Sequence, residues 1–253
     1  MIEEQDAISN KTIKQTEKQL RKYYAKASKD LINEFEQVYD KVLTAVAEGK
    51  EVTPAWLYQL DRYWQLQNQL KQELTQLGDK EIELLTKNFQ KEYIEIYNSI
   101  ALPTNSAFAR LTEQRANSMI NAIWCADGKN FSQRIWKNTE YLTQTLNEEL
   151  VNCVVTGKKT TQLKQKLIER FNVSYNQSNR IVRTEIAHIQ NTAAADRYKD
   201  AGVKKFKVLG REEDDIGCEC KKLNGTIWEF DDAAAPKFPL HCNCRCTIAP
   251  VIE

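Results

Sequence analysis

The stretches 218-CEC-220 and 241-HCNCRC-246 hold five of the seven cysteines in a chain of 253 residues. Thiolates and imidazoles at this density bind borderline cations, and ligand groups on two separate turns are typical of a tetrahedral zinc site. Four ligands complete such a site, and the spacing leaves open which four bind. The side chains on offer are Cys218, Cys220, His241, Cys242, Cys244 and Cys246. Because thiolates are in excess, we expect a closed, structural site rather than a catalytic one.

Disulfides and small buried side chains are the other interpretations of these cysteines. Disulfides need an oxidising compartment, and the chain begins 1-MIEEQD-6, without the charged and then apolar segment of a secretory signal. We therefore expect reduced thiols in a cytosolic protein.

The composition indicates a globular and mostly helical protein. Charged residues make up 28% of the chain and apolar residues 42%, yet the formal net charge is only +1. A charge this small creates no field that would recruit DNA or anionic lipid, so we expect any contact with DNA to be local and weak. No apolar run reaches the roughly 18 residues that span a bilayer, so we expect no membrane partner. Glycine and proline are scarce, which favours long helices.

Apolar residues in the first hundred positions recur at steps of three, four and seven, which predicts long amphipathic helices. The first covers residues 11–48 and breaks at Gly49. The pair Thr53-Pro54 begins the next helix, as N-cap and first-turn proline. We expect Gly78 to end that helix in a left-handed conformation, after which a third helix follows.

A domain boundary is predicted at Pro103, because the residue before a proline is pushed out of helical geometry. Residues 1–103 would then form a helical stalk or bundle, and residues 104–253 a second domain. In this second part the apolar pattern predicts helices over 132–155 and 160–171.

Ser174 and Gln177 have the spacing of a capping box for one more helix. Beyond it, residues 203–209 alternate like a strand with its apolar side inward, and residues 225–228 predict a second strand. The expected fold class is therefore mainly α with a small α+β C-terminal region, in which a metal ion staples the short strands of residues 203–253.

Several short motifs follow one another in the second half of the chain. They are Trp124, Asp127-Gly128, Phe131-Ser132, Arg134-Ile135, 183-RTE-185, Asn191, 220-CKKLNG-225 and 241-HCNCRC-246. Their order resembles the phage Mu protein F-like head morphogenesis family, whose members are minor head proteins of tailed bacteriophages. The resemblance covers about half of the chain, from Trp124 to Val251, whereas the N-terminal helices match only in being helical.

The resemblance implies a metal ion that pins the C-terminal turns together. The implied ligands are Cys220, His241 and Cys244, with Cys218 or Cys246 as the fourth. Such an ion supplies about 10 kcal/mol or more of folding energy, which a segment with few large apolar side chains needs.

Two positions depart from the family's pattern. Gly217 stands where the family has its first cysteine, with Cys218 one residue later. Cys242 stands where the family has proline, which makes it a spare thiol.

Arg183 and Glu185 lie two residues apart on a predicted helix and point about 200° away from each other, so they need partners elsewhere. Arg245 stands between two cysteines, and Glu185 is its candidate partner. We interpret Arg183, Glu185 and Arg245 as a structural hub of hydrogen bonds between this helix and the metal turn.

These features predict a structural minor head protein without catalytic residues, which acts in bacteriophage head morphogenesis. The expected partners are the portal protein and capsid or scaffolding proteins, with packaged DNA bound weakly. The expected location is the head interior or portal of the virion, and the host cytoplasm during assembly; the protein could also leave the head with the DNA. The alternatives are a metal-dependent enzyme or toxin-like domain, for example one that transfers ADP-ribose, and a DNA-binding accessory that uses clusters such as Lys158-Lys159.

Overall fold

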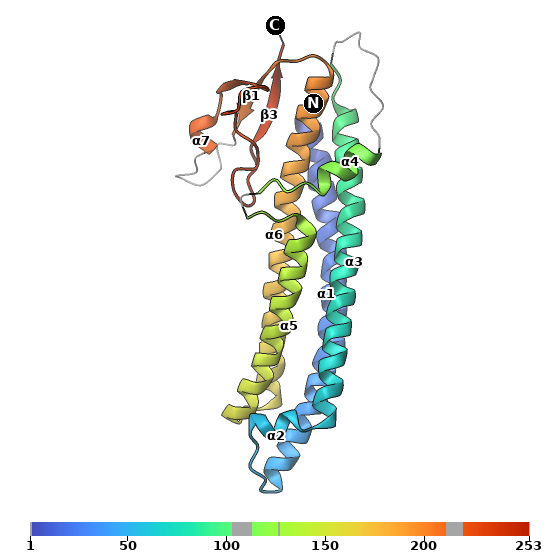
Figure 1. Ribbon diagram of the computed structural model, residues 1–253, viewed down its shortest axis with the longest axis vertical. Helices are drawn as coiled ribbons and strands as arrows, with labels where there is room; N and C mark the ends of the chain where they lie inside the picture. The colour runs from blue at the N-terminus through green and yellow to red at the C-terminus, as the bar shows by residue number, and fades with distance from the viewer. Residues whose placement is uncertain (1, 103–112, 126, 211–219, 253) are drawn as a thin grey trace. The chain divides into compact units, whose positions relative to one another are not determined.

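The computed structural model describes residues 2–102, 113–125, 127–210 and 220–252. It is mainly helical with a small antiparallel sheet near the C-terminus, which confirms the predicted fold class (Figure 1). The elements are α1 (Ile2–Ala47), α2 (Pro54–Tyr58), α3 (Asp61–Ser99), α4 (Glu113–Ile120), α5 (Phe131–Thr156), α6 (Thr160–Asp200), β1 (Lys205–Leu209), α7 (Cys220–Leu223), β2 (Ile227–Glu229) and β3 (Thr247–Val251).

The chain folds into two compact units, each made from separate segments of the sequence. Unit 1 comprises residues 1–17, 84–131 and 179–253, and unit 2 comprises residues 18–83 and 132–178. The boundary predicted at Pro103 lies outside the described residues, and the division there stays a prediction. None of the described helices combines the length and the apolar composition that a membrane crossing requires.

Unit 2 is built from segments of α1, α3, α5 and α6, which run alongside one another (Figure 1). Apolar side chains at helical spacing fill its core, and each contributes about 1.5–3 kcal/mol when fully buried. The largest of them include Leu20, Leu31, Phe35, Leu66, Leu70, Leu146 and Leu167, none more than 1% exposed. The period that predicted these helices is therefore the period of the core.

A buried polar cluster, which we call the Glu81 cluster, crosses this core. The Tyr24 hydroxyl of α1 donates to the Glu81 carboxylate of α3 (3.1 Å) and lies 2.8 Å from the Ser178 hydroxyl of α6. The Asn138 amide of α5 donates to the Ser178 hydroxyl (3.1 Å) and to the Ser174 carbonyl (3.0 Å). No member is more than 5% exposed, and burial raises the pKa of the Glu81 carboxyl to about 7. The carboxyl is thus protonated in mildly acidic solution.

Gly78 does not end a helix, contrary to the prediction, because α3 runs through it without a break. A Cβ atom at this position would lie 2.8 Å from Cζ3 of Trp136 on α5. The glycine therefore makes room for an indole ring rather than for a left-handed turn. The break that does occur lies between α2 and α3, after Tyr58.

Gly78→Ala is expected to destabilise unit 2, although alanine is the better helix former by about 1 kcal/mol. Its methyl group would press on the Trp136 ring, and overpacking of this kind costs about 1–3 kcal/mol. In a Trp136→Leu background the ring is gone, so the same substitution should stabilise by up to about 1 kcal/mol. Urea denaturation of the four proteins measures both changes. A stabilising effect in the parent chain would show that the ring moves aside without cost.

The separate helix predicted over 160–171 and the capping box at Ser174 and Gln177 are also wrong, because α6 is one continuous helix. Ser174 is buried in the Glu81 cluster, where its hydroxyl lies 3.4 Å from that of Tyr24. A tertiary contact thus overrides a local signal for a helix start.

Other predicted helix ends are confirmed. The Thr53 hydroxyl accepts a hydrogen bond from the Trp56 amide (3.2 Å) at the start of α2. Gly49 follows α1 with a φ angle of 78°, the left-handed conformation that suits glycine after a helix. Gly202 follows α6 in the same conformation, with a φ angle of 79°.

The helical part of unit 1 packs around aromatic side chains. The rings of Phe89 and Phe131 meet edge to face at 5.3 Å. The Tyr97 hydroxyl donates to Asp200 at the end of α6 (2.6 Å), and Arg115 of α4 pairs with the same carboxylate (2.7 Å). These contacts hold α3, α4 and α6 together beside the sheet.

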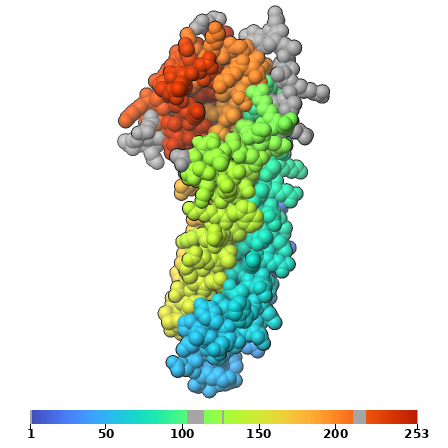
Figure 2. Space-filling view, viewed as in Figure 1, coloured from blue at the N-terminus to red at the C-terminus, as the bar shows by residue number. Residues whose placement is uncertain are grey.

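The sheet has the strand order β2-β1-β3, with both pairs antiparallel. In β1, Phe206 and Val208 are buried and Lys207 between them is exposed, as the alternation predicted. β3 was not predicted; it contains Pro250, which an edge strand tolerates. In Figure 2 this C-terminal segment (red) lies against the end of α6 (orange).

Candidate metal centre

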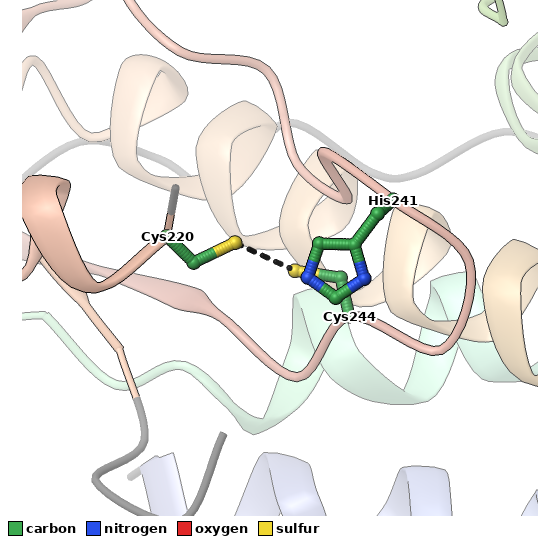
Figure 3. A group of neighbouring side chains, drawn as sticks. All are labelled: Cys220, His241 and Cys244. Atoms are coloured by element: carbon green, nitrogen blue, oxygen red, sulfur yellow. Dashed lines mark hydrogen bonds between the residues drawn. The ribbon is translucent and has the colours of Figure 1, made fainter. Parts of the chain in front are cut away.

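Three of the predicted ligands converge in unit 1. Cys220 begins α7, and His241 and Cys244 lie in the turn that precedes β3. Their ligand atoms all lie within 4.8 Å of one another (Figure 3). The sulfurs of Cys220 and Cys244 are 3.6 Å apart, close to the roughly 3.8 Å expected for two sulfurs on one tetrahedral zinc ion. A disulfide would need about 2.05 Å, so the geometry fits a shared cation.

Cys246 lies beside this group, although it is not one of the three residues whose ligand atoms converge. Its thiol shares hydrogen bonds with the thiols of Cys244 and Cys220. The three cysteines are at most 2% exposed, whereas the His241 imidazole is exposed. We call Cys220, His241, Cys244 and Cys246 the Cys/His cluster. Cys218 lies outside the described residues, so its role as a ligand stays a prediction.

The protonation of the thiols shows how the cluster would receive a cation. Hydrogen bonds from the Cys246 thiol, from the backbone at Cys246 and Leu240, and from the Cys220 thiol lower the pKa of Cys244 to about 5, against the effect of burial. The neighbouring Cys244 sulfur and burial raise the pKa of Cys246. The Cys244 thiolate thus lies beside the Cys246 thiol, which resists ionisation unless a positive charge joins them. Thiolates are the metal-binding form of cysteine, so this donor set fits a borderline cation such as zinc.

Helix α6 fastens the turn 241–246 at two points. Asn243 has a φ of 59°, a left-handed conformation that asparagine tolerates, and its backbone amide donates to the Thr184 hydroxyl (3.3 Å). The Asn191 side chain donates to the carbonyl of Cys246 (3.0 Å). These hydrogen bonds position the turn that carries most of the cluster.

The three side chains predicted as a hub occupy different surroundings. Glu185 is buried and accepts a hydrogen bond from the indole nitrogen of Trp124 (3.0 Å). Arg183 is exposed and pairs with Glu17 of α1 (2.7 Å). Arg245 is exposed, and the described residues give it no ion-pair partner. A hub that joins all three, and a contact between Glu185 and Arg245, stay predictions.

The side chains that do join α6 to the turns were not assigned from the sequence. Thr184, His188 and Asn191 are spaced four and then three residues apart, so they lie on one face of the helix. The His188 ring stacks on Trp124 with centroids 4.1 Å apart, and its Nδ1 lies 3.4 Å from the carbonyl oxygen of Phe238. This spacing was the signal in the sequence that could have identified the face of α6 toward the turn. Arg183 and Glu185 are each one residue away from Thr184, so they point to other sides of the helix.

Cys242 is not among the three residues whose ligand atoms converge, and its description as a spare thiol stays a prediction. It is exposed and lies 3.3 Å from a guanidinium nitrogen of Arg180. Among the described residues, Cys242, Cys244 and Cys246 form no disulfide. The turn therefore contains one exposed thiol, that of Cys242, next to two buried ones.

Comparison with known proteins identifies one family and one relative. Residues 144–249 match the model of the family described as Phage Mu protein F like protein. The match includes the Cys/His cluster but begins later than Trp124. The relative is the NAD(+)–arginine ADP-ribosyltransferase EFV of Enterococcus faecalis, 22% identical over 273 residues. The alignment covers 99% of this chain and 54% of the relative, so the chain spans about half of that protein's length. No solved structure matches the chain.

The family match contains 183-RTE-185, Asn191 and the turn 241–246, the same motifs that carried the resemblance in the sequence. The structure brings these motifs together through the hydrogen bonds of α6 with the turn. Residues 144–249 are therefore similar to the phage Mu protein F-like family in both sequence motifs and their placement.

Proposed function

We propose that the protein is a structural minor head protein that acts in bacteriophage head morphogenesis. The observation that carries this proposal is that the family match over residues 144–249 contains three converging metal-type donors, Cys220, His241 and Cys244, with the buried Cys246 beside them as the candidate fourth. Four protein donors fill a tetrahedral coordination sphere, whereas catalytic sites keep a position open for water or substrate. A closed site clamps turns together and performs no chemistry.

In this proposal the ion is zinc, bound by Cys220, His241, Cys244 and Cys246. When bound, it supplies folding energy to a sheet region that has few large buried side chains of its own, among them Phe206. Helix α7 provides the sulfur of Cys220, and the turn that is hydrogen-bonded to α6 provides the other three donors.

The proposed partners are the portal protein and capsid or scaffolding proteins in the phage head. Exposed apolar side chains near the ends of α1, α2 and α5 and the start of α3 support a protein-binding surface on unit 2, since such patches mark interaction sites. They are Leu43, Val46, Tyr58, Trp64 and Val155, each 39–60% exposed. DNA inside the head would be bound weakly, because the formal net charge is only +1.

The Enterococcus faecalis relative favours a second candidate, an enzyme that transfers ADP-ribose from NAD(+) to arginine. Its 22% identity extends over nearly the whole chain, but the shared part is only 54% of the relative. The alignment therefore covers only about half of the protein whose name carries the transferase activity. A fourth donor at Cys246, which would fill the coordination sphere of the ion, also favours a structural role over this alternative.

Particles made by the encoding phage test the proposal. We expect the protein to sediment with procapsids and virions in several copies, and to be required for DNA-filled heads. Trp64→Glu should lower its incorporation about tenfold or more, as for a tryptophan at the centre of an interface. Gln65→Glu, which changes the exposed neighbour, is the matched control, and circular dichroism shows whether both variants fold.

Two results would contradict this function. One is absence of the protein from assembled particles. The other is transfer of ADP-ribose from NAD(+) to an arginine-bearing acceptor by the purified chain, with repeated turnover.

A further inference from the structure

Unit 1 contains a cavity of about 280 Å³ between the first part of α1, the middle of α6 and the turn that carries Cys244 and Cys246. Its volume is close to the lower end of the range for small-molecule sites. The charged side chains in its walls are Lys14, Arg183, Arg245, Asp6 and Glu17. Three positive and two negative groups leave this cavity with one excess positive charge.

The charged groups differ in how they are already engaged. Arg183 donates to Glu17 through both Nε and a terminal nitrogen, each at 2.7 Å. Asp6 accepts a hydrogen bond from the Gln190 amide (3.0 Å). Lys14 and Arg245 have no acidic partner among the described residues, and both are exposed. Two cations from different parts of the chain therefore remain available at one cavity.

We propose that this cavity binds the phosphate group of a sugar phosphate. Lys14 of α1 and Arg245 of the turn come from two separate segments, and Arg183 of α6, which is paired with Glu17, adds positive charge to the cavity wall. A phosphate directs its oxygens along diverging axes, so it can accept from both Lys14 and Arg245, whereas a carboxylate has two oxygens in one plane. The carboxylate of Asp6, oriented by Gln190, is the acceptor for a sugar hydroxyl.

The phosphate site is coupled to the Cys/His cluster through the backbone of the turn. Arg245 lies between Cys244 and Cys246, and all three line the cavity. A cation that orders these two cysteines also fixes the position of Arg245, so metal and phosphate should strengthen each other's binding by the same factor. This coupling rests on the metal site proposed above, whereas the phosphate site itself does not.

Calorimetric titration of the metal-loaded chain with inorganic phosphate, with AMP and with a short single-stranded oligonucleotide tests this inference. We expect Lys14→Ala and Arg245→Ala each to weaken AMP binding about tenfold, since each removes a charge-assisted contact. Arg245→Lys, which keeps the charge but loses the planar fork, should fall in between. Lys11→Ala, an exposed lysine on the same helix outside the cavity, should bind as the parent chain does.

The outcomes separate the two sources of phosphate. Oligonucleotide binding no tighter than AMP assigns the site to free nucleotides, and tighter binding assigns it to nucleic acid. The site is ruled out if neither phosphate nor AMP binds at concentrations of about 10 mM. It is also ruled out if Lys11→Ala weakens binding as much as Lys14→Ala. Lys14 lies outside the turn that carries the candidate metal ligands, so Lys14→Ala still tests the phosphate site if Arg245→Ala loses the metal. If AMP binds equally well after the metal is removed by a chelator, the coupling is refuted but the phosphate site is not.

Discussion

Cys244→Ser is expected to abolish metal binding and to unfold the segment that follows β1. Its sulfur lies 3.6 Å from that of Cys220, and hydrogen bonds from its surroundings lower the pKa of its thiol, which favours the metal-binding thiolate. A structural zinc ion contributes about 10 kcal/mol or more to folding, which exceeds the stability of a small module. Metal analysis of the purified protein and limited proteolysis after β1 measure the two losses.

Cys242→Ser is the matched control for this change. It replaces an exposed thiol of the same turn, and we expect full metal content and unchanged resistance to protease. Cys246→Ser identifies the fourth ligand. If Cys246 completes the site, this variant should lose the metal as Cys244→Ser does. If Cys218 completes it, the variant should keep the metal as Cys242→Ser does. Retention of metal and of protease resistance in Cys244→Ser would contradict a structural site.

Glu81→Gln is expected to raise the stability of unit 2 at pH 8 by about 3 kcal/mol relative to the parent chain. Burial raises the pKa of this carboxyl from 4.5 to about 7, so the native state holds the proton more tightly than the unfolded chain does. The stabilisation from the protonated carboxyl is complete below pH 4.5 and is lost as pH rises through about 7. Glutamine keeps the acceptor for Tyr24 and has no charge to bury.

Denaturant unfolding between pH 4 and pH 8 checks this result. The parent chain should lose stability across that interval, and Glu81→Gln should remove most of the loss. Glu83→Gln changes an exposed carboxyl on the same helix and should leave the pH dependence as it is. A Glu81→Gln chain whose pH dependence equals that of the parent would show that another group causes it.

The long helices could be predicted because their apolar period is also the period of the core. Their interruptions could not, since the signals at Gly78 and Ser174 are decided by partners far away in the sequence. Gly78 faces the Trp136 ring, and Ser174 belongs to a cluster with Tyr24 and Asn138. A glycine or a serine inside a helical pattern is therefore ambiguous until its neighbours in space are known.

The candidate site was also predictable only in part: its metal-type donors could be identified from the sequence, and the side chains that hold them could not. Cys220, His241 and Cys244 could be identified because few chemical groups bind soft cations and these stand close together in the sequence. The side chains that hold the turn could not be assigned, because Thr184 and Asn191 are ordinary polar residues whose role depends on what α6 packs against. Local chemistry thus indicated the candidate ligands, whereas the side chains that hold the turn in place depend on tertiary packing.

The Glu81 cluster has a consequence for how unit 2 is aligned. Leucine side chains pack acceptably in several longitudinal positions, and a core made of them alone tolerates sliding. Each of α1, α3 and α5 contributes one polar group to the cluster and α6 contributes two, so a slip of any helix by one turn, about 5.4 Å, would strand a buried hydroxyl, amide or carboxyl. The helices of this unit consequently have one register, set by five polar side chains.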